Sequence, residues 1–175
     1  MIQCRKSVES YQKLGKINSF ILLITRMSEE IIKTLIGRRD VANLPDFGLQ
    51  CVAVKVDSGA YTSSIHVTIC QEVEKNGEKQ LEVIFLDGNH PAYSGKLIYF
   101  TSYRRKKVKS STGHDQFRFF IKGSIEILDR KVNTEFSLTE RRGMRYPILL
   151  GRKLLNKRFL IDTSLVNLSQ NKQSL

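Results

Sequence analysis

Residues 54–66 read VKVDSGAYTSSIH, and this stretch decides how the rest of the chain is interpreted. The valines that lead into it recur at every second position, as on one face of a β-strand. The strand predicted over Gln50–Val56 stops at Asp57, and Ser58 and Gly59 follow at once. Turns prefer all three of these residue types. The motif therefore predicts either an ordinary turn at the end of a strand or a carboxylate placed for chemistry.

Further runs rich in β-branched and aromatic residues predict more strands, at Ile65–Ile69, Leu81–Leu86, Lys96–Phe100, Phe117–Leu128 and Val132–Leu138. Turn residues such as Asn76-Gly77 separate them, and this pattern predicts an all-β fold, a closed β-barrel. A buried run at Ile148–Leu150, a helical turn at Lys153–Lys157 and a final strand at Arg158–Asp162 complete the prediction. The segment Glu29–Ile36 fits either a short helix or the first strand.

The length of 175 residues favours one domain with a sizeable core. We expect a loosely held, basic N-terminal arm over residues 1–26, a domain over residues 27–168 and a frayed tail over residues 169–175. Met27, which is followed by SEE, looks like an alternative start. The apolar fraction is 41% and the longest apolar run is far too short for a membrane span, so we expect no membrane partner.

The chain is strongly basic, with 29 Lys and Arg against 17 Asp and Glu, a net charge of +12. Such a surplus favours acidic partners, which can be nucleic acid or an acidic polypeptide. The three cysteines are scattered and odd in number, which argues against a disulfide framework and favours a reducing, cytoplasmic location. The N-terminus shows no secretory signal pattern.

Several catalytic motifs are absent from the sequence. HExxH is missing, and His66, His90 and His114 have no neighbouring second ligand, so we interpret them as surface or half-buried histidines and expect no metal site. No GxSxG occurs, and Cys70 is interpreted as a buried strand residue. No phosphate-binding glycine loop occurs either, so we expect no cofactor.

The run Tyr103–Lys109, YRRKKVK, contains five basic residues that we call the basic strip: Arg104, Arg105, Lys106, Lys107 and Lys109. One interpretation is an edge strand that its charges protect from pairing. The other is a contact surface for phosphate or carboxylate groups. The sequence gives the two interpretations equal weight.

The first motif has a counterpart late in the chain. Asp-Ser-Gly-Ala at residues 57–60, together with the later PILLGRKLL, resembles retropepsin-like aspartic peptidases, in which an Asp-Thr/Ser-Gly-Ala turn precedes a distant Gly-Arg step. VKSSTG followed by Arg118, then SLTERRGMRYPILLGRKLL and FLID, resembles the family long labelled ATP-dependent zinc proteases, now understood as retropepsin-like. Members often accompany ATP-grasp ligases that add glutamates to proteins. The resemblance covers Ile36–Asp162; Ser58 stands where Thr is commoner, and the basic arm has no explanation in it.

This resemblance implies an aspartic endopeptidase whose catalytic carboxylate is Asp57. Each chain supplies one such carboxylate, so the resemblance implies a homodimer in which two carboxylates share a proton and activate water. The active-site loop would be supported by Ser58, Gly59, Ala60, Gly151 and Arg152. The substrate would be an acidic, glutamate-rich polypeptide segment.

A hairpin over Lys109–Phe117 is the expected flap that closes over the substrate. Flap and strip together would bind substrate through Arg104, Arg105, Lys107, Lys109, Ser110, Ser111 and Gly113. Asp162 begins a degenerate second motif, Asp-Thr-Ser, which we interpret as the end of the last barrel strand.

Two rival interpretations stay open. The first is a non-enzymatic basic β-barrel that binds nucleic acid, for which Tyr99, Phe100 and Tyr103 could supply stacking surfaces, although no RNA-binding signature supports it. The second is a catalytically silent protein that binds peptides.

Overall fold

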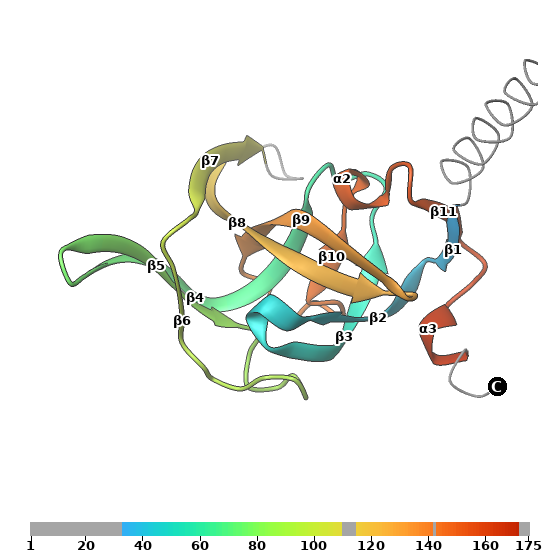
Figure 1. Ribbon diagram of the computed structural model, residues 1–175, viewed down its shortest axis with the longest axis horizontal. Helices are drawn as coiled ribbons and strands as arrows, with labels where there is room; N and C mark the ends of the chain where they lie inside the picture. The colour runs from blue at the N-terminus through green and yellow to red at the C-terminus, as the bar shows by residue number, and fades with distance from the viewer. Residues whose placement is uncertain (1–32, 110–114, 142, 172–175) are drawn as a thin grey trace, which may run out of the picture. The chain divides into compact units, whose positions relative to one another are not determined.

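Strands dominate the part of the chain that the structure describes, which is residues 33–109, 115–141 and 143–171 of the computed structural model (Figure 1). The strands are β1 (Thr34–Gly37), β2 (Arg39–Leu44), β3 (Leu49–Val56), β4 (Ser63–Lys75), β5 (Glu78–Phe85), β6 (Ile98–Phe100), β7 (Arg104–Lys109), β8 (Asp115–Ile127), β9 (Arg130–Thr139), β10 (Ile148–Leu150) and β11 (Phe159–Asp162). The described residues also form three short helical turns, namely η1 (Pro45–Phe47) between β2 and β3, α2 (Arg152–Leu155) between β10 and β11, and α3 (Leu168–Asn171) after β11. The prediction of an all-β fold is confirmed.

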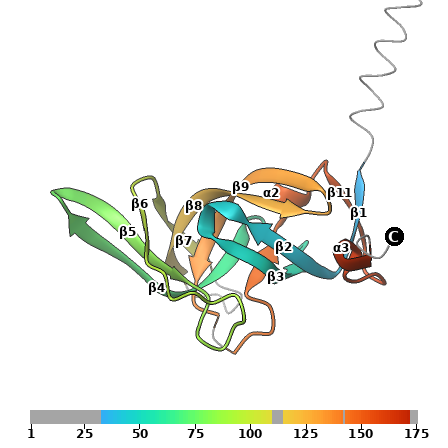
Figure 2. The same cartoon turned by 60° about the horizontal axis from the view of Figure 1, so that its bottom comes forward.

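Six strands pair in a closed ring. Strand β10 lies parallel to β3 on one side and antiparallel to β4 on the other, and the order β3, β2, β8, β9, β4 completes the circuit. Strands β5 and β6 extend the sheet beyond β4, and β7 pairs with β8. Figure 2 shows the β4–β5 hairpin reaching away from the ring.

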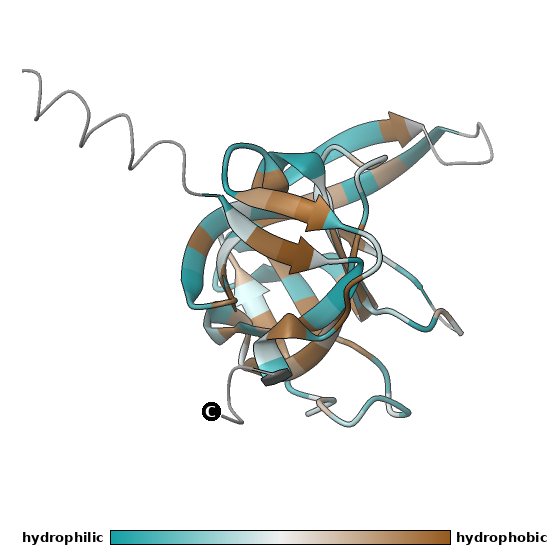
Figure 3. Cartoon of the chain, turned by 90° about the vertical axis from the view of Figure 1, so that its right-hand side faces the viewer, coloured by the Kyte–Doolittle hydropathy of each residue, from teal (hydrophilic) through white to brown (hydrophobic). Residues whose placement is uncertain are grey.

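Local sequence signals explain several of these elements. Asn76 and Gly77 both have positive φ, 55° and 76°, and they close the β4–β5 hairpin as the Asn-Gly pair predicts. Hydrophobic and hydrophilic residues are interspersed along the strands (Figure 3), and the alternate valines Val52 and Val54 of β3 are fully buried. The interior of the ring also includes Ile65, Ile121, Ile125, Phe136, Ile148 and Leu150.

The structure bears on the expectations for the first and last described segments of the domain. Strand β1 resolves the ambiguity of the segment Glu29–Ile36 in favour of a strand, within the residues described there. The interpretation of Asp162 as the end of the last barrel strand is wrong in one respect, because β11 pairs with β1 in a separate two-stranded parallel sheet and not with the ring. Helix α3 continues to Asn171, so the beginning of the expected frayed tail is helical.

Other predictions fall on residues that the structure does not describe. These are the basic arm over residues 1–26 and the tip of the expected flap, including Ser110, Ser111 and Gly113. In the described ranges, no helix has the length and hydropathy needed to cross a membrane.

Candidate active site

Asp57 lies directly after β3, at the point where this strand runs beside β10. The backbone N–H of Asp57 donates to the carbonyl of Leu150 over 3.0 Å, so the end of the strand is fixed by its neighbour. One carboxylate oxygen, Oδ1, accepts hydrogen bonds from the backbone N–H groups of Gly59 (3.0 Å) and Ala60 (3.1 Å). These two bonds form the turn that the Asp-Ser-Gly sequence predicts, and they orient the half-buried carboxylate.

Arg152 supports this turn from the start of helix α2. Its Nη1 donates to the carbonyl oxygens of Ser58 (3.0 Å) and Gly59 (3.1 Å). Its backbone N–H donates to the carbonyl of Ala60 over 2.9 Å. A guanidinium has several donors in a rigid plane, so one side chain can hold two carbonyl groups of the same turn.

Gly151 lies where no larger residue fits. A Cβ at this position would stand 2.6 Å from the carbonyl carbon of Thr62 and 2.9 Å from the backbone nitrogen of Ser63. The N–H of Gly151 donates to the hydroxyl of Ser63, which is fully buried. The structure brings together around Asp57 the five residues that the resemblance implies as loop supports, namely Ser58, Gly59, Ala60, Gly151 and Arg152.

A pocket of about 590 Å³ opens beside the carboxylate. Its lining consists of Lys55, Val56, Asp57, Ser58, Arg141, Met144, Arg145, Tyr146 and Leu149. Three of these side chains are cationic, while Asp57 is the only acidic one. The pocket thus combines one oriented carboxylate with a basic wall.

Arg141 is electrically coupled to the carboxylate. Burial lowers the pKa of its guanidinium, the charge of Arg118 lowers this pKa further, and the charge of Asp57 raises it. Arg141, Arg145 and Tyr146 lie in the motif SLTERRGMRYPILLGRKLL, from which the sequence predicts no role for them. Nothing in the local pattern of that segment shows that it packs beside Asp57, because the contact joins distant parts of the chain.

His66 corrects a prediction, since it is neither a surface nor a half-buried residue. Its side chain is 3% exposed, and its Nε2 lies 3.0 Å from a carboxylate oxygen of Asp87.

Throughout the described ranges, no group of three His, Cys, Asp or Glu side chains is arranged to hold a metal ion. Cys70 is half-buried in β4, and burial raises the pKa of its thiol to about 12.

The basic strip occupies β7, which pairs only with β8 among the described strands and is an edge strand of the described sheet. Part of its charge is neutralised within the fold. Arg104 forms an ion pair with the buried Glu135, and Lys107 lies 2.7 Å from Asp115. The guanidinium carbon of Arg105 lies 4.7 Å from the ring centre of Phe117.

Strands β7 and β8 are the two arms of the expected flap hairpin, and they pair up to Lys109 and Asp115. The side chains that line the Asp57 pocket include none from the described part of the strip.

Asp162 does not share the pocket either. Its Oδ1 accepts hydrogen bonds from the hydroxyl (2.6 Å) and the backbone N–H (2.9 Å) of Ser164. These bonds, the hydroxyl first, hold the pKa of Asp162 below its usual value. The carboxylate of Asp162 is thus occupied by its own turn.

A closed ring of strands with a supported Asp-Ser-Gly turn is typical of the retropepsin-like class. Residues 35–172 match the family model described as "Retropepsin-like aspartic endopeptidase RimB", and the chain therefore belongs to this RimB-like family. The resemblance drawn from the sequence motifs is confirmed.

Relatives and a solved structure share this domain. The chain is 29% identical over 143 residues to a "Probable alpha-L-glutamate ligase" of Desulfotalea psychrophila, covering 79% of this chain and 30% of the relative. It is 30% identical over 136 residues to a protein of the same name from Shewanella pealeana, covering 75% and 29%. The chain thus spans about three tenths of the length of these curated relatives. The crystal structure of a Legionella pneumophila protein of unknown function (DUF785) is similar with a TM-score of 0.61 at 25% identity, covering 79% of this chain and 99% of that chain.

Proposed function

We propose that this protein is an aspartic endopeptidase that acts as a homodimer. Its active site would lie between the Asp57 carboxylates of the two identical subunits, where water hydrolyses the peptide bond of the substrate. The observation that carries the proposal is the orientation of Asp57 by two backbone N–H groups, in a turn whose carbonyls are held by Arg152. Such preorganisation places a reactive group before the substrate arrives. The other carboxylate considered as a partner, Asp162, is engaged by Ser164, which favours a partner carboxylate from a second subunit.

The reaction needs one ionised and one protonated carboxylate. Two carboxylates about 3 Å apart cannot both ionise cheaply, so the pair retains one proton. The ionised carboxylate removes a proton from water, and the water oxygen attacks the peptide carbonyl carbon. The protonated carboxylate donates its proton to the carbonyl oxygen. When the tetrahedral gem-diol intermediate collapses, the carboxyl group that took the proton from water gives it to the leaving nitrogen as the C–N bond breaks. The other carboxylate removes a proton from one hydroxyl of the intermediate, so the pair again holds one proton.

The basic wall of the pocket favours acidic substrates. Lys55, Arg141 and Arg145 lie around the same space as Asp57, and guanidinium groups bind carboxylates through paired hydrogen bonds. The net charge of +12 would also draw an acidic chain toward the protein. We therefore infer that the preferred substrates contain glutamate or aspartate close to the scissile bond.

A second candidate function is binding of single-stranded nucleic acid by the β7–β8 hairpin. Phe117 is 60% exposed, and Arg105 stacks against its ring. Exposed aromatic rings among cations are a common platform for bases. This surface lacks the Asp57 pocket, so the nucleic-acid function would leave the supported turn without a role.

The test is peptidase activity on a glutamate-rich peptide and on a neutral peptide, with wild-type protein, Asp57→Asn and the matched control Asp162→Asn. The proposal expects loss of cleavage in Asp57→Asn alone, because an amide keeps the shape of the side chain but cannot act as a base. A chelator should leave cleavage unchanged. Wild-type activity in Asp57→Asn would refute the assignment. A chelator effect reversed by zinc would refute the metal-free mechanism.

A further inference from the structure

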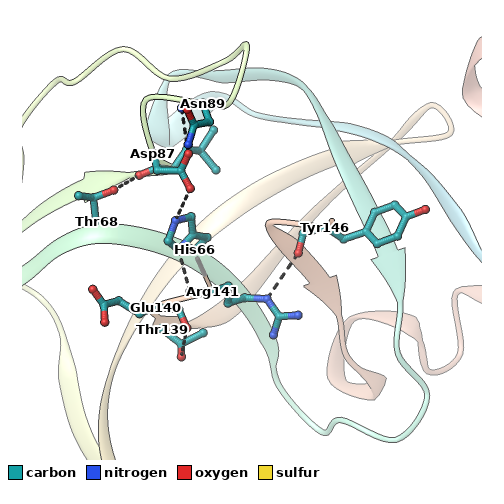
Figure 4. A network of polar contacts seen from close by, with 9 residues as sticks. His66, Thr68, Asp87, Asn89, Thr139, Glu140, Arg141 and Tyr146 are labelled. Atoms are coloured by element: carbon teal, nitrogen blue, oxygen red, sulfur yellow. Dashed lines mark hydrogen bonds and ion pairs between the residues drawn. The ribbon is translucent and has the colours of Figure 1, made fainter. Parts of the chain in front are cut away.

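His66 contacts the backbone of Arg141, a residue that lines the Asp57 pocket. His66 belongs to β4 and is buried, and its two ring nitrogens face different segments of the chain (Figure 4). The Nδ1 atom accepts a hydrogen bond of 2.9 Å from the backbone N–H of Arg141. The Nε2 atom lies 3.0 Å from the Oδ2 atom of Asp87. The ring therefore joins the loop after β5 to the segment after β9.

These contacts define the protonation state of the ring. A backbone N–H can only donate, so Nδ1 must carry its lone pair toward Arg141. The ring is then neutral, with its hydrogen on Nε2, where it donates to Asp87. Asp87 is suited to accept this bond, because the backbone N–H of Asn89 and the His66 side chain hold its pKa below the usual value, against the effect of burial.

The backbone of His66 holds the other end of the same segment. Its N–H donates to the carbonyl of Pro147 over 2.8 Å. One residue thus contacts both Arg141 and Pro147, the two ends of a segment from which four side chains line the pocket: Arg141, Met144, Arg145 and Tyr146. Within the segment, the Arg141 side chain donates to the carbonyl of Tyr146 over 3.4 Å (Figure 4).

We propose that His66 is a positioning residue for the basic wall of the Asp57 pocket. Its neutral ring, oriented by Asp87, fixes the backbone of Arg141 and thereby the direction in which the Arg141 guanidinium enters the pocket. The consequence for substrate binding rests on the proposed peptidase function. The consequence for the order of the segment from Arg141 to Pro147 does not depend on that function.

Two substitutions separate the two ring contacts. In His66→Asn, the amide oxygen stands where Nδ1 stands, so the bond to Arg141 can persist while the contact with Asp87 is lost. In His66→Gln, the amide nitrogen reaches the place of Nε2, so the contact with Asp87 can persist while the N–H of Arg141 loses its acceptor. The control is His90→Gln, because the Nδ1 atom of His90 also accepts a backbone N–H, that of Ala92, but in the loop after β5 and away from the pocket lining.

The first measurement is amide hydrogen exchange over residues 139–149, which needs no substrate. A lost hydrogen bond is worth about 1 kcal/mol, so exchange in this segment should accelerate roughly fivefold in His66→Gln and stay near wild type in His66→Asn and His90→Gln. Equal protection in His66→Gln and wild type would overturn the proposal. Equal acceleration in His66→Gln and His66→Asn would also overturn it, because the ring would then act only by filling space.

The second measurement is steady-state cleavage of an acidic and a neutral peptide. His66→Gln should raise KM for the acidic peptide by about fivefold with a smaller change in kcat. This effect should disappear when Arg141 is already replaced by Ala, as expected for two residues that act through one contact. An equal loss for both peptides would overturn the inference about substrate binding. If wild-type protein cleaves neither peptide, the peptidase function fails, while the exchange measurement still decides the role of His66.

Discussion

Gly151→Ala should test whether the close approach of backbone atoms at residue 151 supports the Asp57 loop, because the substitution adds only a methyl group and removes no functional side chain. A Cβ at residue 151 would lie 2.6 Å and 2.8 Å from the carbonyl carbon and oxygen of Thr62, and 2.9 Å from the nitrogen of Ser63. All three are backbone atoms, so no side chain can rotate away. Since ordinary carbon contacts are about 3.5–4.0 Å, the two backbones must separate by roughly 1 Å.

This displacement determines how far Gly151→Ala lowers the free energy of unfolding. Overpacking in a closely packed region costs about 1–3 kcal/mol, and loss of the Gly151–Ser63 hydrogen bond adds about 1 kcal/mol. A total of about 2–4 kcal/mol corresponds to a fall in Tm of roughly 6–20 °C for a domain of this size. Cleavage should fall as well, because the same displacement moves Arg152 away from the Asp57 turn.

Thermal unfolding followed by circular dichroism measures this effect, with two glycine controls. A Cβ on Gly88 meets no atom within 4 Å, so Gly88→Ala should change the free energy of unfolding by no more than about 0.5 kcal/mol. A Cβ on Gly59 meets only the Oδ1 atom of Asp57, at 3.2 Å, so Gly59→Ala should reduce cleavage more than stability. If Gly151→Ala protein has the same Tm as wild-type protein, the idea that close packing at Gly151 supports the loop is refuted.

Reversal of Arg105 and Lys107 to Glu should reduce kcat/KM for an acidic peptide more than for a neutral one, and the difference should shrink as salt rises, because exposed charges are screened over about 10 Å at 0.1 M ionic strength. An equal loss for both peptides, or no dependence on salt, would leave the basic strip as a protected strand edge only. Cys70 should resist alkylation at about pH 8, because its raised pKa of about 12 keeps the thiol protonated until the pH approaches that value, whereas the exposed Cys51 should react. Peptide mass spectrometry gives the two labelling rates, and equal rates would contradict the raised pKa of the Cys70 thiol.

The parts of the fold that were predicted correctly have local signals. Alternating valines predict β3, and the apolar run Ile148–Leu150 predicts β10 with the bounds that the structure gives. Strand β2 was not predicted, because its sequence RDVANL begins with two charged residues. Asp40 is nevertheless buried, since its carboxylate accepts the backbone N–H groups of Val41 and Ser169. The bond from Ser169 comes from a residue 129 positions away, so the sequence around β2 does not reveal it.

The candidate active site is likewise predictable from the sequence only in part. Asp57 and its turn are visible in one short motif, and the Gly-Arg step at residues 151–152 is the second half of a known pair. The contact of His66 with Arg141 joins residues 75 positions apart, and each residue alone looks unremarkable in sequence. The partner of β11 was also misjudged, because a short apolar strand carries no signal of which strand it will join.

The central claim is that one active site contains Asp57 from each of two subunits. The most direct measurement is cleavage by a fixed amount of wild-type protein mixed with Asp57→Asn protein and allowed to exchange subunits. At about a ninefold excess of the variant, random pairing leaves roughly one tenth of wild-type chains in wild-type dimers, so cleavage should fall to roughly that fraction. Cleavage that stays unchanged at every ratio, with exchange verified by mass spectrometry of tagged subunits, would contradict a site shared between two chains.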